Sequence, residues 1–128
     1  AFSETQTVLQ VNPEVKLIMA IAAPAVPGAA DAVKQSGRTD VKVTGLSLPN
    51  MCKPFIKDGT VPSIVLWNTG NLGYLTVAVA NALVKGDLKP GANSISAGKL
   101  GQIEIAGDEV RLGAPFVFTK DNVDQFDF

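Results

Sequence analysis

The sequence predicts an α/β fold, a three-layer α/β/α sandwich with a mainly parallel sheet. A strand, a turn and a helix follow one another three times after an opening helix, which is the pattern of a parallel sheet. The clearest repeat is residues 63–85, where the apolar run Ile64–Trp67 leads into polar residues 68–71. From Leu72 the apolar residues recur at helical spacing, and Gly86 is placed to end the helix. Right-handed crossovers would bring the three strand-exit turns to one edge of the sheet.

The elements before residue 63 are predicted from caps and short apolar runs. Ser3 and Gln6 have the spacing of a capping box, which predicts a helix ending at Asn12-Pro13 with Val8, Leu9 and Val11 buried. The other predictions are strands at 15–21 and 41–46, a helix from Pro27 to Ser36, and a short helix that Asn50 caps and Gly59 closes. The predicted exit turns are residues 22–26, 47–50 and 67–71.

The last forty residues have a different pattern. Residues 102–105 and 110–112 flank a turn and predict a hairpin, and 115–119 predict another short strand. The chain is therefore expected to be a single α/β lobe over 1–128, with a βα core at 1–86 and strands at 87–128 that return through a hinge. Because it opens on a helix almost without a leader, we expect it to be a fragment of a longer protein.

Composition excludes several classes of function. The 46% hydrophobic and 18% charged residues are typical of a globular domain, and a net charge of −1 does not favour nucleic-acid binding. The chain has no histidine, which removes histidine-based triads and most zinc sites. A single cysteine excludes an internal disulfide, and no apolar run is long enough to cross a membrane. We therefore predict no catalytic residues, no metal and no cofactor.

Three other features of the sequence have structural explanations. Gly70 and Gly73 suggest a phosphate loop, but a tight turn with close helix packing explains two glycines better. Cys52 lies near a helix start, yet without a histidine to activate it we interpret it as an inert, half-buried thiol. The carboxylates Asp31, Asp58, Asp87 and Glu104 are scattered along the sequence. None of them forms a pair that could act as a general acid and a general base.

Trp67 and Asn68 are the strongest candidates for ligand contact. A tryptophan at the end of a buried strand is often a core residue, and that alternative stays open here. A flat apolar ring beside a carboxamide also suits a small polyhydroxylated ligand, which needs a face to stack on and a group to bind a hydroxyl. Asn71 is interpreted as the cap of the following helix.

The chain resembles the C-terminal half of type I periplasmic substrate-binding proteins, in the rhamnose and autoinducer-2 receptor branch of ABC importers. The resemblance lies in GLSLPNMCKPFIKDGTV, LWNTGNLGYLTVAVANALVKG and the terminal FVFTKDNVDQFDF, in that order along nearly the whole chain. It implies a two-lobed receptor that closes on a sugar-like molecule. The missing N-terminal lobe would then supply the other wall of the cleft.

The resemblance carries two groups of site residues over to this chain. Trp67 and Asn68 match the family's Trp-Asp/Asn step, and Ile21, Ala22, Ala23 and Pro24 match the loop that meets the ligand. Many sugar binders have an acid or amide in that loop, whereas Ala22 and Ala23 offer only backbone groups, as autoinducer-2 receptors use. The implied partners are a small sugar-like ligand and the ABC permease subunits, and contact with the permease would be the only contact with the membrane. The implied location is the periplasm or, in a Gram-positive organism, the outside of the cell, where a lipid would anchor the receptor.

Two other functions are alternatives for a chain of this fold class. The same fold forms the effector-binding half of sugar-responsive transcription regulators, which an upstream helix-turn-helix segment would favour. A free-standing enzyme domain ranks last, because no phosphate-binding loop supports a cofactor.

Overall fold

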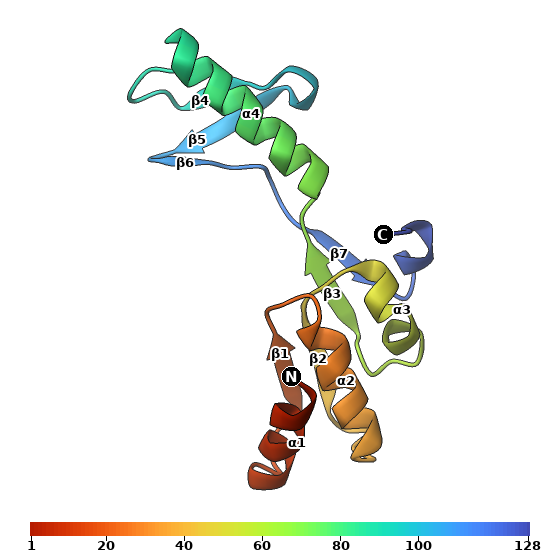
Figure 1. Ribbon diagram of the computed structural model, residues 1–128. Coiled ribbons are helices and arrows are strands. Elements are labelled where there is room, and N and C mark those ends of the chain that lie inside the picture. Colours follow the sequence, from red (N-terminus) through yellow and green to blue (C-terminus); the bar gives the residue numbers. More distant parts are fainter. The chain divides into compact units, whose positions relative to one another are not determined.

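The computed structural model describes residues 1–128, and the chain forms two compact units (Figure 1). Unit 1 comprises Ala1–Leu66 and Phe116–Phe128, and unit 2 comprises Trp67–Pro115. The fold is α/β with a mainly parallel sheet, as predicted. The boundaries between the units fall between residues 66 and 67 and between residues 115 and 116. The organisation as a single lobe with a core at 1–86 stays a prediction. None of the helices combines the length and apolar character needed to cross a lipid bilayer.

Unit 1 is built on a four-stranded sheet of order β1-β2-β3-β7. The strands are β1 (Leu17–Ala20), β2 (Lys42–Leu46), β3 (Ser63–Leu66) and β7 (Phe116–Thr119). The first three are parallel, and β7 pairs antiparallel with β3 so that Leu66 lies opposite Phe116. All four predicted strands are confirmed. They are shorter than predicted, however, so Ile21 and Trp67 lie just beyond the strand ends.

One face of this sheet is covered by helices. They are α1 (Phe2–Val11), α2 (Ala25–Gln35) and α3 (Pro49–Lys57), followed near the C-terminus by the 3₁₀ turn η2 (Val123–Gln125). Helix α2 packs on β1 and β2, α3 packs on β3, and α1 packs on α2. The fully buried side chains between these layers form the main core and include Val26, Val33, Val43, Ile56, Ile64 and Phe118.

Two predicted helix caps were wrong. Helix α1 begins one residue before Ser3, with Ala1 at the N-cap and no capping side chain. Helix α3 begins at Pro49, because the fixed φ of proline suits the first helical position. Asn50 is therefore inside the helix, and its side chain donates to Asp127 Oδ1 at 3.0 Å. Gly59 follows this helix with a φ of 82°, the left-handed conformation expected of a closing glycine.

Unit 2 packs one helix on a small antiparallel sheet. It contains α4 (Thr69–Lys85), β4 (Ser94–Ser96), η1 (Gly98–Leu100), β5 (Gln102–Ala106) and β6 (Glu109–Val110). The predicted hairpin is confirmed as β5 and β6, and β4, which was not predicted, pairs with β5. The buried stripe of α4 is narrower than predicted, because Leu75 is buried whereas Leu72 and Leu83 are exposed.

Gly45 sets how closely β1 and β2 approach each other. Its φ is 146°, and a Cβ at this position would lie 1.8 Å from the carbonyl oxygen of Ala20. Ala20 and Gly45 are register partners in the parallel pair. Only glycine fits here, and this contact fixes β1 directly before the loop that begins at Ile21.

Candidate ligand-binding site

The carboxyl edge of the unit 1 sheet carries the first group of predicted site residues. Because β1 and β2 are parallel, Ala20 and Leu46 end at the same edge, and the chain leaves them through residues 21–24 and 47–48. Open α/β sheets bind their ligands at this edge.

The loop Ile21–Pro24 is held in place by its own backbone and by the neighbouring strand exit. The Ala25 N–H donates to the Ala22 carbonyl at 2.8 Å, which closes the turn into α2. The Ser47 hydroxyl donates to the Ala23 carbonyl at 2.7 Å, and Ser47 is fully buried. This buried hydrogen bond holds the loop in place, and the sequence pattern did not predict it. A serine directly after a strand was the only signal for it.

The polar groups that this loop offers to a ligand belong to its backbone. The N–H groups of Ala22 and Ala23 make no hydrogen bond within the chain, and both residues lie at the positive N-terminal end of α2. Ile21, Ala22 and Pro24 are exposed and apolar. The loop can therefore donate hydrogen bonds to ligand oxygens and can also contact an apolar group of the same ligand.

Trp67 and Asn68, the second group of predicted site residues, lie at the start of unit 2. Trp67 belongs to neither hydrophobic cluster, and 40% of its surface is exposed, so the structure does not use it as a core residue. Asn68 is the N-cap of α4, and its Oδ1 accepts the Asn71 N–H at 2.8 Å. The prediction that Asn71 caps this helix was therefore wrong.

The cap leaves the Asn68 side-chain amide free. Because Oδ1 faces the helix N-terminus, Nδ2 is available as a donor to a ligand hydroxyl. Residues 21–24 belong to unit 1, and residues 67–68 belong to unit 2.

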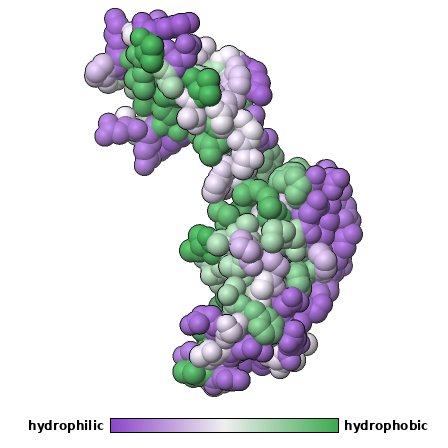
Figure 2. Space-filling model, in the orientation of Figure 1, coloured by the Kyte–Doolittle hydropathy of each residue, from purple (hydrophilic) through white to green (hydrophobic).

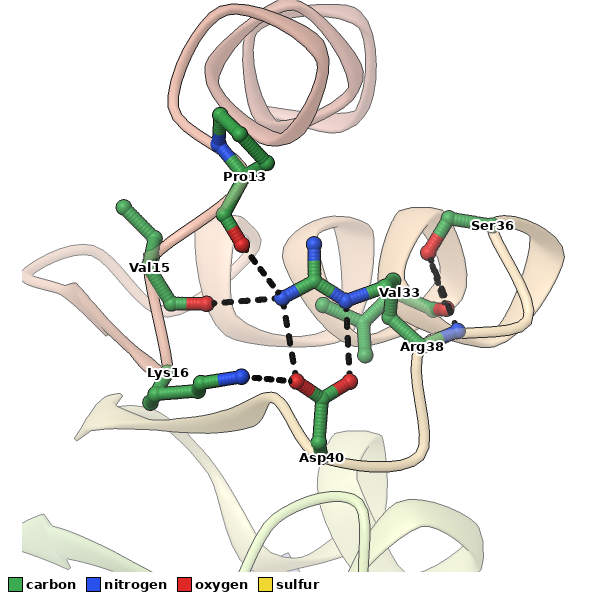
Figure 3. Close-up of polar contacts among 7 residues, drawn as sticks. All are labelled: Pro13, Val15, Lys16, Val33, Ser36, Arg38 and Asp40. Atoms are coloured by element: carbon green, nitrogen blue, oxygen red, sulfur yellow. Dashed lines mark hydrogen bonds and ion pairs between the residues drawn. The ribbon is translucent and has the colours of Figure 1, made fainter.

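A cluster of charged side chains lies at the opposite, amino edge of the unit 1 sheet (Figure 3). Arg38 Nε donates to Asp40 Oδ1 at 2.8 Å, and its Nη2 reaches the carbonyls of Pro13 at 2.9 Å and Val15 at 3.1 Å. Lys16 also pairs with Asp40. The hydrogen bonds from Arg38 and then from Lys16 hold the pKa of the Asp40 carboxyl well below its usual range. These contacts join the entries to β1 and β2.

Cys52 is buried more completely than predicted. Its side chain is fully inside the main core, and burial raises the pKa of the thiol despite a hydrogen bond with Ser47. The helix start near Cys52 therefore does not produce a reactive thiolate. The interpretation as an inert cysteine fits this environment.

Unit 2 contains a cavity of about 640 Å³ between α4 and β4. Its lining includes Tyr74, Asn81, Asp87 and Ser96, none of which was a predicted site residue. The lining has no cluster of acids, and the cavity is separate from Trp67 and Asn68.

The fold and the carboxyl-edge loop define a class, the α/β binding domains that hold a small molecule at the ends of parallel strands. A family model described as "Periplasmic binding protein domain" matches residues 1–88. The chain therefore belongs to the periplasmic binding protein domain family, which confirms the resemblance seen in the sequence. The prediction that it is not an enzyme agrees with this family of binding proteins.

Three solved structures are similar over nearly the whole chain. A sugar ABC transporter protein from Actinomyces odontolyticus is 35% identical with a TM-score of 0.81, over 99% of this chain and 42% of that one. LsrB from Clostridium saccharobutylicum, in complex with AI-2, is 28% identical with a TM-score of 0.81, over 99% and 44%. A solute-binding protein from Clostridium phytofermentas, with bound L-rhamnose, is 30% identical with a TM-score of 0.83, over 96% and 43%. The chain thus spans less than half the length of these proteins.

Proposed function

We propose that this chain is the C-terminal part of a solute-binding protein of an ABC importer. The full protein binds a small sugar-like ligand, of the rhamnose or autoinducer-2 type, in a cleft between two lobes. The observation that carries this proposal is the similarity, at 28–30% identity and TM-scores of 0.81–0.83, to structures with AI-2 and L-rhamnose bound. The alternative of a transcription regulator has no comparable support.

The free backbone groups of residues 21–24 would contact the ligand from unit 1. The Ala22 and Ala23 N–H groups would donate to ligand oxygens, and their unused state in the chain supports this role. Ile21 and Pro24 would contact an apolar part of the ligand. L-Rhamnose and AI-2 each carry a methyl group beside several oxygens, so both match a loop that combines apolar side chains with backbone donors.

Trp67 and Asn68 would contact the ligand from unit 2. The exposed indole ring of Trp67 provides a face for stacking on a sugar ring, and the Asn68 Nδ2 provides a donor for a hydroxyl. Neither group is used in a hydrophobic core of the structure. That availability supports both as ligand contacts.

The partners and location follow from the importer role. The closed receptor would present its ligand to the permease subunits in the membrane, and no nucleic acid or cofactor takes part. The receptor would work in the periplasm, or outside the cell with a lipid anchor in a Gram-positive organism.

The test is a titration of the product of the complete reading frame with L-rhamnose and with AI-2, followed by calorimetry. Trp67→Ala should weaken binding about tenfold or more, because it removes the stacking face. Asn68→Ser should also weaken binding, since serine keeps the helix cap but lacks the amide donor. Thr7→Ala, on the exposed surface of α1, is the matched control and should bind as the unmodified protein does. Unchanged affinity in both site variants would refute the site, and no binding of either ligand by the unmodified protein would refute the proposed ligand class.

A further inference from the structure

Ser47 is the only polar residue of the chain whose exposed fraction is 0%. It lies directly after β2, at the carboxyl edge of the unit 1 sheet. Its N–H donates to the Val65 carbonyl of β3 at 3.4 Å, which ties Ser47 itself to the sheet. Burying a hydroxyl is unfavourable unless it makes a hydrogen bond, so the bond to the Ala23 carbonyl is what this serine contributes at a core position.

The peptide groups on both sides of Ala23 are held by hydrogen bonds. On one side, the Ala22 carbonyl accepts the Ala25 N–H at 2.8 Å. Because this peptide bond is trans, the Ala23 N–H points the opposite way, out of the first turn of α2. On the other side, the nitrogen of Pro24 carries no hydrogen, so the carbonyl is the only polar group of that peptide. Ser47 Oγ donates to this carbonyl at 2.7 Å, and the Ala23 N–H is left as a donor with a fixed direction.

The two hydrogen bonds fix this donor relative to different parts of unit 1. The bond within the turn joins the loop to α2, whereas the bond from Ser47 joins it to the ends of β2 and β3. Both carbonyls already accept a hydrogen bond, so the unused polar groups of Ala22 and Ala23 are their N–H groups. This part of the loop is therefore suited to a ligand oxygen that acts as an acceptor.

The side chains around the donor are apolar. In Figure 2 hydrophobic surface gathers on the side of unit 1 where β1 ends. Ile21 is 75% exposed there, and Ala22 and Pro24 are exposed as well. A hydrogen bond made beside apolar groups is screened less by water, and it weakens steeply when its angle is poor. The direction of the Ala23 N–H should therefore affect ligand affinity strongly.

We propose that Ser47 is a positioning residue for ligand binding, which acts through the Ala23 carbonyl and does not touch the ligand. It holds the Ala23 N–H in the direction that a ligand oxygen requires before the ligand arrives. A loop that occupies the competent position only part of the time lowers the apparent affinity by that fraction, and a preorganised loop avoids this loss. The proposal rests on the proposed function, because it requires a ligand at residues 21–24.

Ser36 provides a matched control. Its hydroxyl donates to the Val33 carbonyl, also at 2.7 Å, but at the C-terminal end of α2, away from the loop. Ser36→Ala and Ser47→Ala therefore each remove one hydroxyl and one hydrogen bond to a backbone carbonyl. Both variants are made in the product of the complete reading frame, and chemical denaturation establishes conditions under which each is fully folded.

The first measurement is nuclear magnetic relaxation of the Ala23 amide without ligand. Its order parameter should be that of rigid backbone, about 0.85, in the unmodified protein and in Ser36→Ala. In Ser47→Ala it should fall below about 0.6, the range of flexible backbone. Equal order of this amide in all three proteins would overturn the proposal, because the loop would then be held without Ser47. This result does not depend on which ligand the receptor binds.

The second measurement is calorimetric titration of the same three proteins with L-rhamnose and with AI-2. Ser47→Ala should weaken binding about tenfold, whereas Ser36→Ala should bind as the unmodified protein does. Unchanged affinity in Ser47→Ala, or the same loss in both variants, would overturn the positioning role while the proposed function stands. Failure of the unmodified protein to bind either ligand would instead refute the proposed function, and the role of Ser47 in binding with it.

Discussion

Single residues control the geometry of the loop at Ile21. The close approach of Ala20 and Gly45 fixes the end of β1, and Ser47 fixes the Ala23 carbonyl. Both contacts are made by small residues, so neither adds a side chain to the surface of the proposed site. Their effect is to hold the backbone donors of the loop in one position.

Gly45→Ala should destabilise unit 1 by at least about 3 kcal/mol, because the new Cβ would overlap the Ala20 carbonyl and the φ of 146° would be strained. Chemical denaturation measures this. Gly59→Ala is the matched control, because Gly59 also has a positive φ but has open space around its Cα. It should cost only about 1 to 2 kcal/mol. Equal losses in the two variants would contradict the role of the β1–β2 contact.

Asp40 gives the amino edge of the sheet a predictable pH dependence. Because its pKa is lowered in the folded state, the ion pairs stabilise the protein above the pKa of the unfolded carboxyl, about 3.9. This contribution is lost as the pH falls further. Asp40→Asn should therefore lower stability at pH 7, and its difference from the unmodified protein should shrink as the pH falls below about 4.

Thermal unfolding between pH 2.5 and 7 checks this expectation, and added salt should reduce the effect because the side chains are partly exposed. Asp31→Asn, at an exposed position on α2, is the control. A constant difference between Asp40→Asn and the unmodified protein across this range would argue against the ion pairs as the cause.

At the scale of elements, the cap of α4 is the contact with most bearing on the proposed function. Asn68 uses its Oδ1 to begin the helix, whereas its Nδ2 is not used by the cap. In the proposed site, helix start and ligand contact would be combined in this one residue, and substitutions that separate them are informative.

Asn68→Ala should destabilise the first turn of α4 by about 1 kcal/mol, whereas Asn68→Ser should leave it nearly unchanged, because serine also caps helices well. Hydrogen exchange at the Asn71 amide, which donates to the cap, measures this directly. Similar protection of that amide in the two variants would show that the side-chain cap contributes little.

The sequence predicted elements well and their long-range contacts poorly. Strands β1, β2, β3 and β7 were predicted correctly because short runs of β-branched and aromatic residues are typical of strands. The caps were misassigned by two to three residues, since Asn50, Asn68 and Asn71 all have capping side chains and only backbone geometry selects among them. The Arg38 cluster depends on partners about 25 residues away, which local pattern cannot reveal. The exit turn at 22–26 was predicted from the pattern of elements, and the family resemblance then assigned residues 21–24 to ligand contact.

At the scale of the whole molecule, apolar surface is exposed on both units. Leu17 and Met19 on β1 are examples in unit 1, and Val77 and Val84 on α4 are exposed in unit 2. Chain 1–128 alone should therefore self-associate as its concentration rises. It should also bind sugar weakly or not detectably, because half of a cleft buries too little of a small ligand.

Light scattering of the isolated chain across a concentration series checks the first expectation, and calorimetry with L-rhamnose and AI-2 checks the second. Met19→Lys should reduce self-association, because it replaces an exposed apolar side chain of β1 with a charged one. A strictly monomeric chain at high concentration, or sugar binding as tight as that of the complete protein, would contradict the corresponding expectation.

The pairing of Leu66 with Phe116 makes unit 2 an insertion with neighbouring ends. The chain leaves unit 1 after Leu66 and returns at Phe116, on the adjacent antiparallel strand. Antiparallel neighbours can be joined by a two-residue turn such as Asn-Gly. Excising 67–115 and closing the gap with that turn would convert β3 and β7 into a simple hairpin. Unit 1 would become one uninterrupted stretch of chain, with its hydrogen-bonded register unchanged.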